Sequence, residues 1–243
     1  MEVGPTQGVA DRLDAMEAAV DAGSNDLAAL GFWPLIAQVK RDRVLVDEHA
    51  AQIGRIDTNA FRARVRGRVP VWAGNLLLLA GVAVGAGFVT LAFVSDTAWI
   101  KGLSLIAAAG IWSLCIHGPA HYLTGRVLDM RFTDYFLGGP PPPRPGLKTD
   151  LASYLKVDAA SRAWFHASGA VATKLAPFVA LAFWPGSGAP GWAAVALLLL
   201  GIGQIVTDLT LSVKTSDWKK FLRERAVARS MEPAPPIPAP AGA

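Results

Sequence analysis

The chain is poor in cysteine and in charge. Its 243 residues include a single cysteine, Cys115, so no disulfide can form within the chain. Only 17% of the residues are charged, whereas a typical soluble domain has about 25%. Residues 1–30 contain acidic side chains and no apolar stretch, so we expect no signal peptide. These deficits exclude a small disulfide-bonded secreted domain and favour a membrane protein.

Long apolar stretches are abundant, and 52% of all residues are hydrophobic. Four stretches each approach the ~20 residues needed to cross a bilayer. They cover about residues 71–94, 98–127, 163–184 and 191–213. Tryptophans mark most of their ends, as is typical of side chains at a membrane interface. The sequence therefore predicts an all-α, polytopic membrane protein with about four transmembrane helices.

Residues 1–70, before the first apolar stretch, are expected to be cytosolic and helical. Apolar side chains recur there at helical spacing: Val9, Leu13, Met16 and Val20. A second helix is predicted from near Pro34 to about Ile56, since proline is tolerated in a first turn. His49, which has polar neighbours, is expected to be a solvent-exposed histidine.

Basic residues beside the apolar stretches predict the orientation. Arginines precede the first stretch, and lysines and arginines follow the fourth, so both termini are expected on the cytoplasmic side of the inner membrane. The domains would then be a cytosolic segment 1–70, a transmembrane core 71–213 with a cytosolic loop at 125–162, and a basic, then Pro/Ala-rich cytosolic tail 214–243. These basic flanks suit anionic membrane lipid, and nothing else in the sequence supports nucleic-acid binding.

Two histidines lie four residues apart at the end of the second apolar stretch. On a helix, His117 and His121 share one face. Two imidazoles at this spacing can hold a transition metal, most readily zinc. Pro119, between them, removes a backbone hydrogen bond and predicts a kink. Ionisable groups at membrane depth are costly, which favours a functional role for this pair.

A carboxylate and a third histidine are predicted at a similar depth. His117 lies roughly 27 Å along a helix from the tryptophan that begins its stretch, and Asp208 lies roughly 24 Å from its own. We predict that His117, His121 and Asp208 bind Zn²⁺, a set that favours zinc over magnesium or calcium. His166 could be a fourth ligand, a group that orients a ligand, or an interfacial histidine. Asp208 could alternatively pair with a nearby cation: Arg126, Lys174 or Lys214.

Three short motifs carry a resemblance to a known family. Residues 117–121 (HGPAH) look like a degenerate HExxH helix, residues 166–170 (HASGA) resemble a Gly-rich helix start, and residues 204–208 (QIVTD) end in an aspartate. In this order they resemble the three core helices of the site-2 proteases, which are intramembrane zinc metalloproteases. The resemblance covers about residues 98–215. It implies a zinc site towards the cytosolic side, with the aspartate as a ligand.

The chain departs from that family at the catalytic base. The glutamate that follows the first histidine of HExxH is Gly118 here, and Leu209 follows Asp208 where the family has LDG. Loss of a general base typically costs ~10²–10⁴-fold in rate. Asp129 or Asp134 could replace it only if the loop at 125–162 folds back.

The sequence therefore predicts a site-2-protease-like membrane protein that binds zinc. It would be a pseudoprotease or a weakly active metalloprotease that binds or acts on transmembrane segments of partners. The alternative is a non-enzymatic four-helix membrane protein, in which the His/Asp cluster is structural or relays protons.

Overall fold

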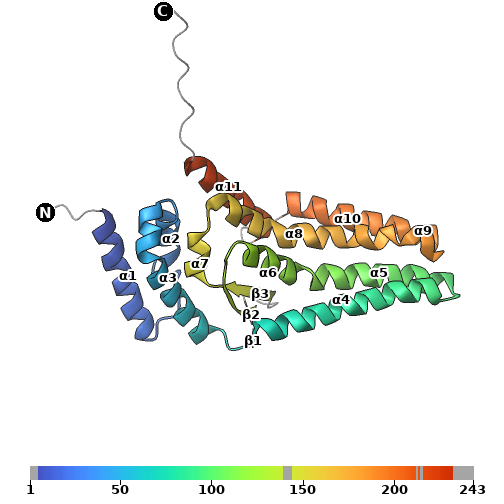
Figure 1. Ribbon diagram of the computed structural model, residues 1–243, viewed down its shortest axis with the longest axis horizontal. Coiled ribbons are helices and arrows are strands. Elements are labelled where there is room, and N and C mark those ends of the chain that lie inside the picture. Colours follow the sequence, from blue (N-terminus) through green and yellow to red (C-terminus); the bar gives the residue numbers. More distant parts are fainter. Residues whose placement is uncertain (1–4, 139–143, 212, 214–215, 232–243) are drawn as a thin grey trace, which may run out of the picture.

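The structure is a computed structural model that describes residues 5–138, 144–211, 213 and 216–231. Among these residues, four helices are long and apolar enough to cross a membrane: α4 (Val71–Val94), α5 (Ala98–Cys115), α8 (Ala159–Ala182) with the short α9 (Trp184–Ser187), and α10 (Gly191–Thr210). They extend side by side from one end of the molecule (Figure 1). The predicted set of four apolar helices is confirmed, and it indicates a membrane protein.

The first two of these helices pack closely because α4 contributes glycines to the contact. A Cβ on Gly81 would overlap Cys115 Sγ, and a Cβ on Gly85 would overlap the Trp112 indole. The indole Nε1 in turn donates a hydrogen bond to the Val82 carbonyl at 3.0 Å. Small residues therefore let α5 approach the α4 backbone, as is common between membrane helices.

The outward faces of the apolar helices carry large aliphatic side chains. Leu76 and Leu77 on α4 are 63% and 72% exposed, and Leu199 on α10 is 63% exposed. Apolar surface of this extent is unfavourable in water and suits contact with lipid chains.

The N-terminal segment folds as a helical unit with its own core. It consists of α1 (Pro5–Asp21), α2 (Phe32–Val39) and α3 (Arg43–Arg64). The largest fully buried side chains of this core come from all three helices and from α7 (Leu151–Lys156): Leu13, Phe32, Leu35, Ile53, Ile56 and Leu155. We call α1–α3 the N-terminal bundle.

Two expectations for this bundle are corrected. The predicted single helix from Pro34 to Ile56 is interrupted, because the Asp42 carboxylate caps a new helix by accepting hydrogen bonds from Val44 N at 2.9 Å and Leu45 N at 3.4 Å. His49 is 5% exposed rather than on the surface, because it lies on the inner face of α3.

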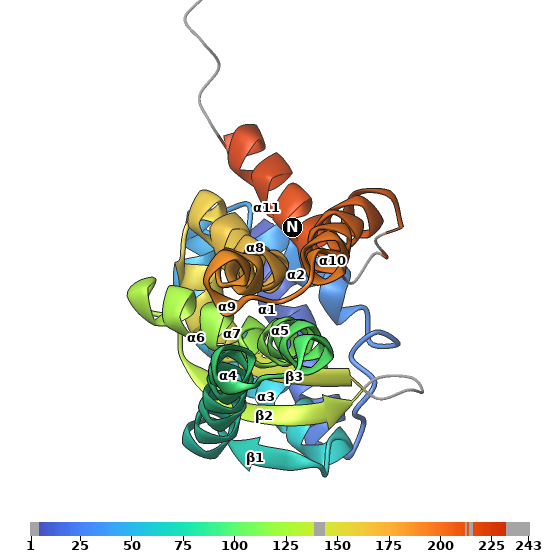
Figure 2. The same cartoon turned by 90° about the vertical axis from the view of Figure 1, so that its right-hand side faces the viewer.

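The described part of the segment expected to be a cytosolic loop, residues 125–138 and 144–162, forms regular elements, and they are not all helical. It contains the end of α6 (His117–Val127), β2 (Phe132–Gly138), β3 (Arg144–Thr149), α7 and the start of α8. With β1 (Arg68–Pro70) these strands form an antiparallel sheet in the order β1-β2-β3. The sheet lies beside α4, and Tyr135 of β2 packs against Gly74 of that helix (Figure 2).

The segment expected to be a basic tail, residues 214–243, also contains a folded element. Helix α11 (Asp217–Met231) packs along α8, with Phe221 against Ala163 and Ala167 (Figure 1). The Pro/Ala-rich part of this prediction, residues 232–243, lies outside the described residues.

Candidate metal centre

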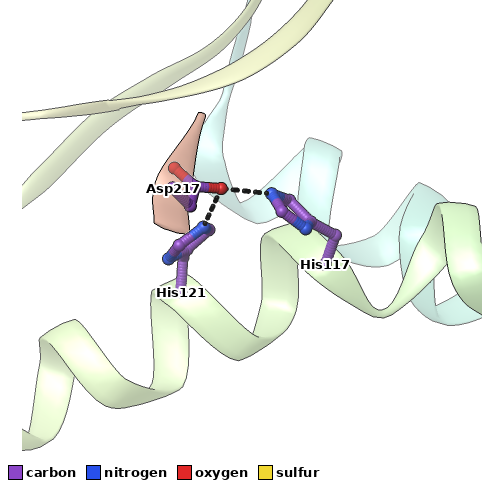
Figure 3. Close-up of side chains that lie close together, drawn as sticks. All are labelled: His117, His121 and Asp217. Atoms are coloured by element: carbon purple, nitrogen blue, oxygen red, sulfur yellow. Dashed lines mark hydrogen bonds and ion pairs between the residues drawn. The ribbon is translucent and has the colours of Figure 1, made fainter. Parts of the chain in front are cut away.

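Helix α6 presents the histidine pair on one face. It begins at His117, directly after Ile116 separates it from α5. The kink predicted from Pro119 therefore takes the form of a break at Ile116, and Pro119 occupies the first turn of α6, where its missing N–H has no helical partner to lose. The rings of His117 and His121 lie 4.8 Å apart between centroids and point to the same side (Figure 3).

Both rings point to one carboxylate oxygen of α11. Asp217 Oδ2 lies 3.1 Å from His117 Nε2 and 3.2 Å from His121 Nε2 (Figure 3). Each of the three residues offers one atom that could bind a metal, and these three atoms lie within 4.8 Å of one another. The group is thus two imidazole nitrogens and one carboxylate, the set expected for a transition metal.

The opposite ring nitrogens fix the tautomer of each histidine. His121 Nδ1 lies 2.8 Å from the Phe165 carbonyl, which can only accept, so Nδ1 carries the proton. The Thr173 hydroxyl donates to the Gly169 carbonyl at 2.9 Å. It therefore accepts from His117 Nδ1, which lies 3.1 Å away. In the neutral form, both histidines thus present an unprotonated Nε2 to the carboxylate.

Two nitrogen lone pairs and a carboxylate oxygen then face one another with no donor between them. This arrangement is repulsive unless a cation occupies the centre or extra protons bind there. Tetrahedral zinc with bonds of about 2.1 Å separates its ligand atoms by roughly 3.4 Å, close to the N···O distances of 3.1 and 3.2 Å. The Nδ1–H hydrogen bonds also orient the rings in the way usual for metal-ligating histidines.

The charge of Asp217 is strongly stabilised by its surroundings. Burial alone would raise its pKa, but hydrogen bonds from His117 and His121, made when their Nε2 atoms carry a proton, and the charge of Lys220 hold the pKa far below its usual range. Lys220 Nζ donates to Oδ1 at 2.9 Å, so the other oxygen remains for the histidines. Asp217 is thus an ionised carboxylate, the form that can bind a metal.

Asp208, predicted as the third ligand, is not in the converging group, and Asp217 takes its place. The Asp208 carboxylate pairs with Lys174 of α8, one of the alternatives that the sequence left open. Both aspartates and His117 line the same pocket of about 310 Å³. Asp208 therefore lies in the same pocket as His117, at the end of α10, but its carboxylate faces Lys174 instead of the imidazoles.

His166, the possible fourth ligand, is also outside the converging group. Its Nε2 lies 2.9 Å from the Tyr154 hydroxyl, which in turn lies 3.2 Å from Glu224 Oε1. The side chain takes part in a separate polar network between α7, α8 and α11. In this arrangement its ring contacts Tyr154 instead of the three converging side chains.

Position 118, where HExxH has its glutamate, is narrowly confined by Tyr135 of β2 and Leu78 of α4. A Cβ on Gly118 would lie 3.0 Å from Tyr135 Cε1 and 3.1 Å from Leu78 Cδ1. The Tyr135 hydroxyl is held by a 2.8 Å hydrogen bond to Asn75. Asp129 and Asp134, the possible substitute bases, are not part of the converging group within the described residues.

Asp217 was missed because it lies in a segment interpreted as a charged tail. The signal that identifies a packed helix there is the apolar pair Trp218 and Phe221, three residues apart within a basic run. Both side chains face α8 and place the first turn of α11 over the histidines.

Comparison with other proteins adds no family assignment. No protein-family model, curated protein or solved structure matches the chain. A functional assignment therefore depends on the geometry and chemistry of the site itself.

Proposed function

We propose that this chain is an integral membrane protein that holds a zinc ion on a site-2-protease-like scaffold and binds transmembrane segments of partner proteins without cleaving them efficiently. The supporting observation is the convergence of the Nε2 atoms of His117 and His121 on one carboxylate oxygen of Asp217. The termini are proposed to be cytoplasmic, in the inner membrane, which agrees with the basic residues flanking the apolar helices.

The likeness to the protease family is carried by the histidine pair and by the small-residue segment of α8. The carboxylate that faces the histidines, Asp217, comes from α11, which follows the helix that matches the third core helix of that family. Gly169, in the small-residue segment that resembles the middle helix, allows the close approach of His121. These are resemblances of arrangement, and they support the proposed scaffold.

Weak or absent proteolysis follows from the missing base. Bound zinc acidifies its water, but proton transfer to a leaving amine also requires a positioned acid or base. Position 118 has no carboxylate, and the Tyr135 ring leaves little room for a longer side chain there. Membrane segments of partners are the proposed ligands because the pocket beside His117 and Asp217 is lined by two helices long and apolar enough to cross a membrane, the middle of α8 and the C-terminal end of α10.

Metal analysis of detergent-purified protein tests the proposal. We expect about one zinc per chain, and we expect His117→Ala, His121→Ala and Asp217→Asn each to weaken zinc binding by roughly 100-fold or more. Such a loss exceeds the 10–100-fold typical of residues that only orient a ligand. The matched control is Asp208→Asn, which removes a carboxylate of the same pocket and should retain zinc. Wild-type protein without zinc, prepared without chelators, would refute the proposal.

A second candidate function is a proton-binding membrane protein with no metal. It is favoured by the sharing of one Asp217 oxygen by two imidazoles, since one added proton also relieves their repulsion. This candidate predicts no zinc and histidine ring resonances that report a charged imidazole. It also predicts that membrane substrates are not cleaved, whereas a weakly active protease would show cleavage that His121→Ala abolishes.

A further inference from the structure

Glu224 is a buried carboxylate that joins four helices. Its Oε1 accepts hydrogen bonds from Nζ of Lys40, the residue that follows α2, at 2.6 Å and from the Tyr154 hydroxyl of α7 at 3.2 Å. Its Oε2 accepts from Arg162 Nε of α8 at 2.9 Å. The side chains of Glu224 and Arg162 are 5% and 3% exposed, and that of Lys40 is 18% exposed. This contact links the N-terminal bundle to the helix that carries Asp217.

Glu224 and Asp217 lie on the same face of α11. They are seven residues apart, which on a helix is about 10 Å along the axis and within about 20° in rotation. A helix of this length moves as a rigid element, so a displacement at Glu224 also displaces Asp217. Bound zinc tolerates deviations of only about 0.2 Å in its ligand distances.

The other contacts of α11 fix the distance between α11 and α8. They fix the position of α11 along the axis of α8 less strongly. Phe221 packs on Ala163 and Ala167, whose methyl groups offer a smooth surface. Directional contacts are made by Glu224 with Lys40, Tyr154 and Arg162. Charged hydrogen bonds depend on geometry more strongly than apolar contacts do, so they fix the axial position of the helix.

We propose that Glu224 is a positioning residue for the metal centre, and that Lys40 makes the zinc affinity of that centre depend on docking of the N-terminal bundle. This inference rests on the proposed zinc binding. Displacement of the bundle from α11 would then shift Asp217 and lower the zinc affinity of the site. His166 takes part in the same network, because its Nε2 is hydrogen-bonded to the Tyr154 hydroxyl that contacts Glu224.

Zinc affinity of the full-length Lys40→Met variant tests the inference, measured by competition with a chromogenic chelator. We expect about 10-fold weaker binding, in the range typical of residues that act through a ligand. Lys40→Arg should restore most of the affinity, because it keeps the charge. The matched control is Arg55→Gln, which breaks the ion pair with Glu17 inside the same bundle and does not touch α11.

The visible spectrum of cobalt-loaded protein is a second measurement. It reports the ligands around the metal, so a loss of folding stability alone does not change it in folded protein. In folded Lys40→Met the spectrum should differ from that of wild type and of Arg55→Gln, because the Asp217 oxygen is displaced. Glu224→Gln provides a second variant with the same expected direction. An unchanged spectrum and affinity in folded Lys40→Met would overturn the inference, as would failure of both Lys40→Met and Glu224→Gln to fold. Wild-type protein without zinc would instead refute the proposed function.

Discussion

Gly169 provides the space that the His121 ring occupies on the face of α8. A Cβ built at this position would overlap three ring atoms of His121, including Nε2. The ring cannot move aside without losing the bond from its Nδ1–H to the Phe165 carbonyl. One missing methyl group on a neighbouring helix thus determines whether this imidazole can face Asp217.

Gly169→Ala should therefore weaken zinc binding by roughly 10- to 100-fold, the cost usual for disturbing the orientation of a ligand. Zinc competition on purified protein measures the change. Gly110→Ala is the matched control, because its Cβ would meet no atom within 4 Å and it also lies in an apolar helix. Equal affinities for the two variants would contradict the role assigned to Gly169.

At the scale of single elements, α11 is the helix on which the site depends. Its first residue is the carboxylate that faces both histidines, its middle packs on α8, and Glu224 joins it to the N-terminal bundle. Burial alone would raise the pKa of Glu224, but the charges of Arg162 and Lys40 and their hydrogen bonds lower it. The helix is therefore held by a carboxylate that must stay ionised.

Acidification should weaken this attachment. Because the pKa of Glu224 in the folded chain is below its usual 4.5, the carboxylate contributes stability that is fully present above that pH and lost as the pH falls below it. The groups that face it are Lys40, Arg162 and Tyr154, with His166 behind the tyrosine. Thermal melts between pH 6 and pH 3.5 should thus fall more steeply for wild type than for Glu224→Gln, which cannot titrate. Parallel curves would exclude this contribution.

At the scale of the whole molecule, two of the hydrophobic cores lie on opposite sides of the candidate site. The N-terminal bundle has its own buried aliphatic core, which Leu155 of α7 joins, and the apolar helices have another around Leu105 and Leu197. The sheet, α6, α7 and α11 lie between them (Figure 1). The N-terminal bundle is therefore connected to the candidate metal site through these elements.

The proposed orientation predicts which surfaces are accessible from each side of the membrane. In a Cys115→Ser background, Asp96→Cys in the turn between α4 and α5 should react with a membrane-impermeant thiol reagent in intact cells. Arg41→Cys in the N-terminal bundle should react only after permeabilisation. Both positions are exposed in the structure, so burial does not explain a difference. Labelling of Arg41→Cys in intact cells would contradict the proposed orientation and indicate the opposite one.

The sequence by itself determined the apolar helices and the histidine pair, because hydropathy and an i, i+4 spacing are local properties of the chain. It also determined the break near Pro119, since a proline cannot donate the helical hydrogen bond. The sheet escaped prediction because its three short strands are distant in sequence and gain their hydrogen bonds only when the chain folds back.

Only the tertiary structure decided which carboxylate faces the histidines. Asp208 and Asp217 are nine residues apart and line the same pocket, so depth along a helix could not separate them. Lys174 on α8 neutralises the first, whereas Phe221 and Glu224 dock α11 so that the second reaches both imidazoles. The choice depends on contacts between distant segments, and no local pattern encodes such contacts.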